Sequence, residues 1–152
     1  PKNTTQLCDE EKREVIATLD DGELSGFSGW SGPRFLGGAR VRQLEADLCV
    51  FFGVQNAVTF NSATSALHAS LVAAGIGPGD EVIVSPYSMV ASATCVLMCN
   101  AIPVFADVEP DMFCLDPASV EMNITAQTRD ILTVNLFGKP SNLASLSRLA
   151  DQ

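Results

Sequence analysis

The sequence is poor in positive charge and has no long apolar run. Its 152 residues include 9 Lys and Arg against 18 Asp and Glu, and the net charge of -9 would repel nucleic acid in most orientations. No stretch approaches the ~20 apolar residues that cross a bilayer, and the first residues lack the apolar core of a signal peptide. We therefore expect a cytoplasmic protein without nucleic acid or membrane partners.

The sequence also lacks the side-chain spacing of a metal centre. Its five cysteines show no paired CxxC spacing, and a single histidine, His68, is available to support them. Cys95 and Cys99 lie four residues apart and could form half of a metal site. On an otherwise apolar helix, however, they are expected to act as small hydrophobic side chains. We predict no metal, and free, mostly buried thiols.

Short apolar runs alternate with stretches of helical periodicity along most of the chain. Helices are predicted at residues 9–19, 39–52, 64–74, 88–100, 117–124 and 141–150. The runs between them are rich in Val, Ile and Phe and too short for helices, which predicts strands at residues 57–60, 81–85, 103–108 and 130–136. This alternation predicts an α/β fold, with a mostly parallel sheet, helices on both faces and ligands at the carboxyl ends of the strands.

Several residues mark the ends of the predicted helices. Asp9 is the expected N-cap of the first helix, and Asp116 followed by Pro117 forms a second cap, with proline at the first helical position. Gly53 is expected to end the second helix. The helix from Thr64 is apolar nearly all round, which predicts that it is covered on several sides.

A glycine-rich segment divides the chain near its beginning. Residues 25–38, SGFSGWSGPRFLGG, contain too many glycines for the interior of a helix or strand and therefore form a long loop. Such a loop is either a docked functional loop or a flexible connector. We predict a segment at residues 1–38, consisting of a helix and this loop, followed by a larger part of a domain at residues 39–152.

The most informative segment is Phe60–Leu67, in which a predicted strand runs through a turn of small residues directly into a helix. Free backbone N–H groups and the positive end of the helix dipole meet there, and Ser62, Thr64 and Ser65 add hydroxyl groups. This combination suits a phosphate, although Ser and Thr are also ordinary helix caps. The glycines at 75–79 follow a helix and precede a strand, the reverse of a dinucleotide-binding loop.

Several strings of the sequence together resemble the DegT/StrS-type aminotransferases. They are the loop ending in FLGG, the NSAT turn, GIGPGDEVIV, PVFADVEPD and NLFGKP, and the similarity runs from about Leu24 to the last residue. The resemblance implies an incomplete aspartate-aminotransferase-like large domain that binds pyridoxal 5'-phosphate (PLP). It also implies an N-terminal fragment of an aminotransferase acting on nucleotide-linked keto sugars.

The resemblance assigns cofactor contacts to four residues. Thr64 and Ser65 match the pair whose side chain and backbone amide hold the cofactor phosphate, and Ala63 beside them is also expected to contact the cofactor. Met89 stands where many members have an aromatic ring stacked on the pyridine, so this chain departs from the common pattern. A thioether can still pack against a π face. The alternative for Met89 is a core methionine on the helix predicted from Ser88.

Substrate contacts are implied for three further residues. Asn135 and Phe137 match positions near the active-site cleft, where members often carry His and Tyr. Trp30 lies in a loop that in the family reaches towards the neighbouring subunit, where it would contact substrate or partner.

The lysine that the chemistry requires has no counterpart in this sequence. The chain contains Lys2, Lys12 and Lys139, and none stands in the context of the family's Schiff-base lysine. Lys139 is interpreted as a surface loop residue. We therefore expect a fragment that is inactive alone and forms a homodimer or higher oligomer through its uncovered sheet. The alternatives are a non-enzymatic domain for assembly or small-ligand binding, and a fragment of a PLP-dependent dehydratase or a sensor of the same fold.

Overall fold

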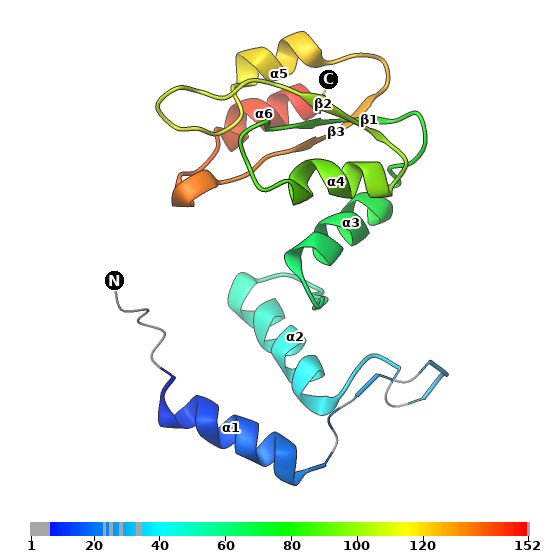
Figure 1. The fold of residues 1–152 in the computed structure, drawn as a ribbon, viewed down its shortest axis with the longest axis vertical. Helices are drawn as coiled ribbons and strands as arrows, with labels where there is room; N and C mark the ends of the chain where they lie inside the picture. The colour runs from blue at the N-terminus through cyan, green and yellow to red at the C-terminus, as the bar shows by residue number, and fades with distance from the viewer. Residues whose placement is uncertain (1–6, 23, 25, 28, 33–34, 152) are drawn as a thin grey trace. The chain divides into compact units, whose positions relative to one another are not determined.

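The computed structural model describes residues 7–22, 24, 26–27, 29–32 and 35–151 (Figure 1). The chain divides into two compact units, Pro1–Thr59 and Phe60–Gln152, which are described separately. The predicted boundary after residue 38 stays a prediction.

In the first unit, helix α1 (Asp9–Asp20) begins at the predicted residue and ends one residue later than predicted. Cys8 is its N-cap, with extended backbone, and its backbone N–H and thiol donate to the Glu11 carboxylate at 2.7 and 2.5 Å. The thiol bond lowers the pKa of Glu11. The prediction of Asp9 as the cap is wrong, because Asp9 is already helical; its carboxylate pairs with Lys12 at 3.0 Å instead.

Helix α2 (Ala39–Phe52) follows the glycine-rich loop and ends as predicted at Gly53, which adopts a left-handed conformation with φ 66°. The backbones of Gly26 and Gly38 approach so closely that a Cβ on Gly26 would overlap Gly38. Arg40 forms ion pairs with carboxylates of the α1 segment, Glu14 and Asp21. No residue of α2 is fully buried: Val41 and Leu48 are half-buried, and Leu44, Phe51 and Phe52 are exposed.

The second unit is built on a parallel sheet of three strands, β1 (Glu81–Val84), β2 (Ile102–Phe105) and β3 (Thr128–Leu132). Their order is β2-β1-β3. The central strand β1 is buried along nearly its whole length, which fits its uninterrupted apolar sequence. The parallel sheet predicted from the sequence is thereby confirmed.

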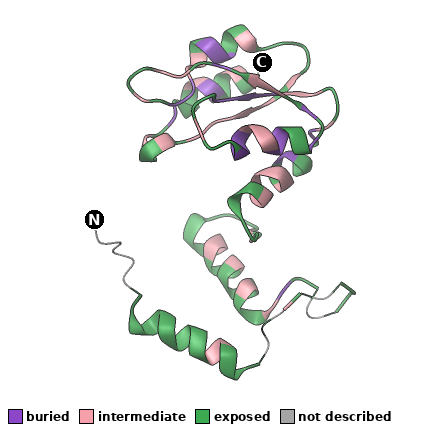
Figure 2. Cartoon of the chain, viewed as in Figure 1, coloured by how far each residue is buried: buried purple, intermediate pink, exposed green. Residues whose placement is uncertain are grey.

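Helices cover both faces of this sheet, as predicted (Figure 1). Helices α3 (Ala63–Ala73) and α4 (Ala91–Met98) lie on one face, and α5 (Pro117–Asn123) and α6 (Leu143–Ala150) lie on the other. Figure 2 shows buried residues in the central strand of the sheet and in the helices that cover it. Cys95 and Cys99 belong to the α3–α4 side of the core, which confirms their role as small hydrophobic side chains.

Cap chemistry accounts for several helix ends of the second unit. Asp116 accepts the N–H of Ala118 at 3.0 Å and is followed by Pro117, as expected. Gly75 adopts φ 83° and ends the α3 segment. In contrast to the prediction, α3 is not covered on several sides, since Leu71 is its only fully buried residue. Leu67 is half-buried against the same core, whereas Val72 is 55% exposed.

Two predicted elements differ more strongly from the structure. Residues 57–60 are extended but form no strand, and the backbone N–H of Thr59 donates to the Glu45 carboxylate at 2.9 Å instead of to a neighbouring strand. The helix predicted from Ser88 begins at Ala91, because the chain first makes a turn in which the Ser85 hydroxyl accepts the N–H of Tyr87 at 3.2 Å.

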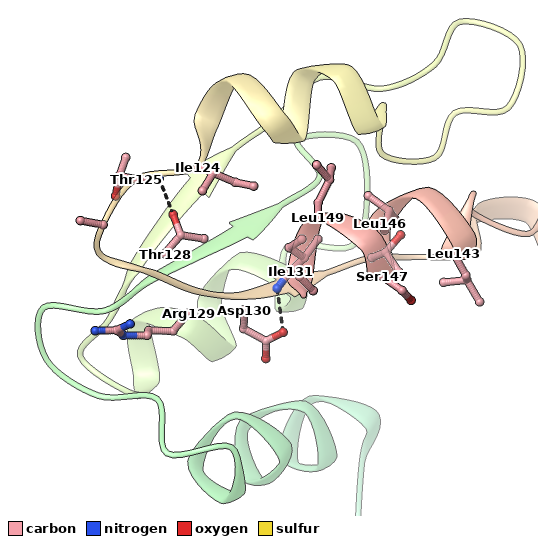
Figure 3. A pocket seen from close by; sticks show the side chains of 13 residues that line it. Ile124, Thr125, Thr128, Arg129, Asp130, Ile131, Leu143, Leu146, Ser147 and Leu149 are labelled. Carbon is pink, nitrogen blue, oxygen red and sulfur yellow. Dashed lines mark hydrogen bonds between the residues drawn. The ribbon is translucent and has the colours of Figure 1, made fainter. Parts of the chain in front are cut away.

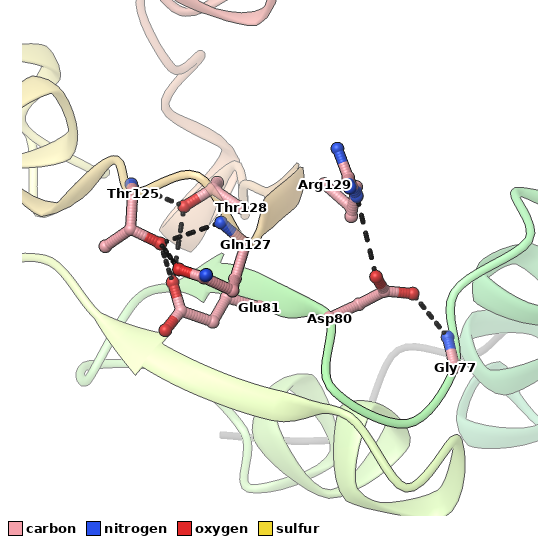
Figure 4. Close-up of polar contacts among 7 residues, drawn as sticks. All are labelled: Gly77, Asp80, Glu81, Thr125, Gln127, Thr128 and Arg129. Atoms are coloured by element: carbon pink, nitrogen blue, oxygen red, sulfur yellow. Dashed lines mark hydrogen bonds and ion pairs between the residues drawn. The ribbon is translucent and has the colours of Figure 1, made fainter.

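A polar cluster fastens β3 to β1 at the amino end of the sheet (Figure 4). The Thr125 hydroxyl donates to the Glu81 carboxylate at 2.5 Å. Asp80, which precedes β1, accepts the N–H of Gly77 at 2.8 Å and lies 3.5 Å from the Arg129 guanidinium. These contacts stabilise the turn before β1, and they lie at the end of the sheet opposite to the carboxyl ends of the strands.

Candidate functional site

The first turn of α3 lies towards the carboxyl end of the parallel sheet. The helix ends at Ala73 and β1 begins at Glu81, so the helix runs back along the sheet in the direction opposite to the strand (Figure 1). Its N-terminus therefore points to the side where the strands end. This is the side on which ligands of parallel α/β sheets bind.

Backbone and side-chain donors are exposed at this turn. Ser62 is the N-cap, and its Oγ accepts the N–H of Ser65 at 3.2 Å while donating to the Ser65 hydroxyl at 3.0 Å. The N–H groups of Ala63 and Thr64 have no acceptor among the described residues. Ser62, Ala63 and Thr64 are exposed and Ser65 is half-buried. Two free amides, hydroxyl donors and the helix dipole make this turn chemically suited to an anion such as a phosphate.

Met89 lies in the connection between β1 and α4 and is 73% exposed. It precedes the first residue of α4, so the interpretation as a core methionine on a helix is wrong. Helix α4 connects the parallel strands β1 and β2 and runs back along the sheet, so its N-terminus, like that of α3, lies on the carboxyl side (Figure 1). Contact between Met89 and a cofactor stays a prediction.

Asn135 and Phe137 lie in the turn that follows β3, which includes a short 3₁₀ segment (Leu136–Gly138). The Asn135 side-chain oxygen accepts the N–H of Ser141 at 3.0 Å, so this side chain holds the turn closed. Phe137 is 73% exposed and has φ 55°. The structure thus brings both residues to the carboxyl side of the sheet, and their contact with substrate stays a prediction.

Sequence reasoning missed an aromatic cluster at this turn. The rings of Tyr87, Phe113 and Phe137 come from three different loops, and their centroids lie 6.0 to 6.4 Å apart. The Lys139 amine lies 5.3 Å from the centre of the Phe113 ring and donates to the Asp111 carbonyl at 2.6 Å. No local pattern predicts this meeting, since it depends on the left-handed backbone at two phenylalanines.

The other candidates lie elsewhere. Trp30 belongs to the first unit, where its side chain is 74% exposed, and its role stays a prediction. His68 is half-buried within α3. No group of three or more potential metal ligands occurs in the described ranges. Among the helices described, none has the length and apolar character needed to cross a membrane.

A groove of the second unit does not coincide with these residues (Figure 3). It has a volume of about 470 Å³ and runs between the outer edge of β3 and helix α6, where Ile131, Leu146 and Leu149 line it. The Asp130 carboxylate accepts the N–H of Ile131 at 2.7 Å, which satisfies one backbone donor of a strand that has a neighbour, β1, on one side only. We interpret this groove as an uncovered sheet edge and not as a catalytic pocket.

Comparison with known proteins decides the family. Residues 28–152 match the model of the DegT/DnrJ/EryC1/StrS aminotransferase family. The chain belongs to this family. Its parallel sheet with helices on both faces is part of the fold of these PLP-dependent enzymes.

Three similar proteins illustrate the relationship within the family. L-glutamine:2-deoxy-scyllo-inosose aminotransferase of Streptomyces paromomycinus is 40% identical over 91% of this chain and 32% of its own length. GDP-perosamine synthase of Caulobacter vibrioides is 45% identical over 69% of this chain and 28% of its own. The PLP-form structure of the putative sugar aminotransferase Spr1654 of Streptococcus pneumoniae has a TM-score of 0.78 and 32% sequence identity. The similarity covers 95% of this chain and 34% of that one. The chain thus spans about one third of the length of these relatives.

Proposed function

We propose that the chain is the N-terminal part of a PLP-dependent aminotransferase acting on nucleotide-linked keto sugars, and that the first turn of α3 holds the cofactor phosphate. The observation that carries this proposal is the pair of free amides at Ala63 and Thr64 beside the Ser65 hydroxyl. Membership of the aminotransferase family and the PLP-form of a similar structure support the choice of cofactor.

The residues fit a phosphate because every group they present is a donor. The amides of Ala63 and Thr64 would point at its oxygens, and the hydroxyls of Thr64 and Ser65 would complete the contacts. Met89 would pack against the ring on the carboxyl side of β1. When bound, PLP supplies an electron sink for bond breaking at the substrate carbon.

An NMR titration with inorganic phosphate tests this site. In an ¹⁵N-labelled chain, the amide signals of Ala63 and Thr64 are expected to shift most, because their free N–H groups would bond the anion directly. Shifts spread over unrelated surface amides, or confined to another segment, would overturn the proposal.

We further propose that the chain alone does not catalyse transamination, because no described lysine is set up as the required nucleophile. Lys12 pairs with Asp9 on exposed α1, and the Lys139 amine is engaged by the Asp111 carbonyl. Mixing the chain with PLP, reducing it with borohydride and digesting it tests this directly. A specific pyridoxyl adduct on one lysine, together with turnover, would refute the statement.

The proposal extends to the setting of the protein. Free thiols at Cys95, Cys99 and Cys114, all buried, fit a reducing compartment and support a cytoplasmic location. The exposed side chains of Phe51 and Phe52 on α2 support assembly into a homodimer or higher oligomer.

A further inference from the structure

Three aromatic rings meet where the three strands of the sheet end. Tyr87 follows β1, Phe113 lies in the loop after β2, and Phe137 lies in the turn after β3. Their ring centroids form a triangle with sides of 6.0, 6.4 and 6.4 Å. The rings remain accessible, with exposed fractions of 50%, 39% and 73% respectively. The cluster is therefore an aromatic surface and not part of the core.

Two of these rings are held by strained backbone. Phe113 has φ 60° and Phe137 has φ 55°, in the left-handed region that bulky residues rarely adopt. Hydrogen bonds keep both turns in place: the N–H of Phe113 donates to the Glu109 carbonyl at 2.9 Å, and that of Gly138 to the Asn135 carbonyl at 3.2 Å. Since the rings are not buried, packing does not offset this strain, and such outliers gather at functional sites.

A positive charge stands beside the rings. The Lys139 amine lies 5.3 Å from the centroid of Phe113 and donates one hydrogen bond to the Asp111 carbonyl. No carboxylate within the described ranges forms an ion pair with it. A positive charge without a carboxylate partner stands out in a chain whose net charge is -9. Its two remaining N–H donors and its charge are available to an anion.

We propose that Tyr87, Phe113, Phe137 and Lys139 form the subsite for the nucleotide part of the substrate. The base would stack on the exposed faces of Phe137 and Tyr87, and Lys139 would contact the diphosphate. This inference rests on the proposed function, from which it takes the substrate class, and it assigns the base and the diphosphate to specific residues. An apolar peptide would use the rings but not the amine, so the combination favours an anionic nucleotide.

Binding of uridine diphosphate and of inorganic pyrophosphate to the 152-residue chain tests the subsite. Pyrophosphate carries the anion without the base. Uridine diphosphate is therefore expected to bind about tenfold more tightly, which is the gain in affinity expected from one stacked base. Phe137→Ala is expected to abolish this difference and leave pyrophosphate unaffected. Lys139→Gln is expected to weaken both ligands. Lys12→Gln is the matched control on an exposed amine, and it is expected to leave the affinity for both ligands unchanged.

A second readout does not depend on variants. Tyr87 is the only tyrosine, so its ring signals in an NMR spectrum are unambiguous, and a stacked base is expected to shift them upfield. Equal affinities for the two ligands, an unchanged spectrum of Tyr87, or tight nucleotide binding by Phe137→Ala would overturn the inference. Nucleotide binding at Tyr87 without phosphate-induced shifts at Ala63 would support this subsite while contradicting the proposed cofactor site.

Discussion

Two serines in the first turn of α3 are expected to respond oppositely to replacement by alanine. The Ser62 Oγ accepts the N–H of Ser65, which is the work of a helix cap, whereas the Ser65 hydroxyl only receives a bond from Ser62. Ser62→Ala should therefore lower the free energy of unfolding by about 1 kcal/mol. In a chain of this length, that corresponds to a fall of about 3 °C in the melting temperature. Ser65→Ala should change stability by less than about 0.5 kcal/mol.

The effect on phosphate affinity should be the reverse. The Ser65 hydroxyl would bond the anion, and hydrogen bonds to charged groups are worth about 1.5 kcal/mol or more, so Ser65→Ala should weaken phosphate binding about tenfold. Ser62→Ala should leave affinity within about twofold, because the Ser62 hydroxyl acts as the helix cap and has no assigned contact with the anion.

Thermal unfolding followed by circular dichroism, with and without phosphate, measures both effects in the same samples. The reasoning would be refuted if Ser62→Ala lost affinity as strongly as Ser65→Ala, or if Ser65→Ala were the less stable of the two variants. Either result would mean that the two hydroxyls do not divide the roles of cap and ligand.

Three further predictions concern the stability of the chain and its self-association. Asp80→Ala should lower the free energy of unfolding in chemical denaturation by about 1 to 2 kcal/mol, because it leaves the N–H of Gly77 without its acceptor. Arg129→Ala should lower it by less than about 1 kcal/mol, because the arginine of that ion pair is exposed, and equal costs would contradict this. Burial raises the pKa of the Cys95 thiol from its ordinary value of 9.0, so the unfolded chain loses this proton first and the free energy of unfolding should fall as the pH rises above 9. Cys95→Ala should lack that part of the fall, and identical stability profiles against pH for the parent chain and this variant would disprove it. Light scattering should give a mass above that of the monomer, and Phe51→Glu should reduce it, whereas a clean monomer at high concentration would rule out self-association.

Local patterns predicted most elements of the fold because they act over a few residues. The periodicity of α1 and α2, the cap at Asp116 and the left-handed Gly53 all lie where the sequence indicated. The buried run at β1 correctly indicated the centre of a parallel sheet. In each case the residue that gives the signal also causes the local structure, either as a side-chain acceptor or as a residue that tolerates positive φ.

Signals that depend on a distant partner could not be read in the same way. The extended segment at 57–60 has strand-forming residues, but the Glu45 carboxylate takes the N–H of Thr59. Helix α4 begins late because a serine hydroxyl closes a turn before it. The aromatic cluster forms from three separate loops, which carry Tyr87, Phe113 and Phe137, so no single stretch of sequence predicts it.

The most direct test compares binding of pyridoxine 5'-phosphate and pyridoxine to the chain by calorimetry. Neither compound has the aldehyde that reacts with lysine, so the comparison isolates the phosphate. Because the amides of Ala63 and Thr64 would bind that group, the phosphorylated compound is expected to bind at least about tenfold more tightly, and Ser65→Ala should reduce the difference. Equal affinities for the two compounds would contradict the account.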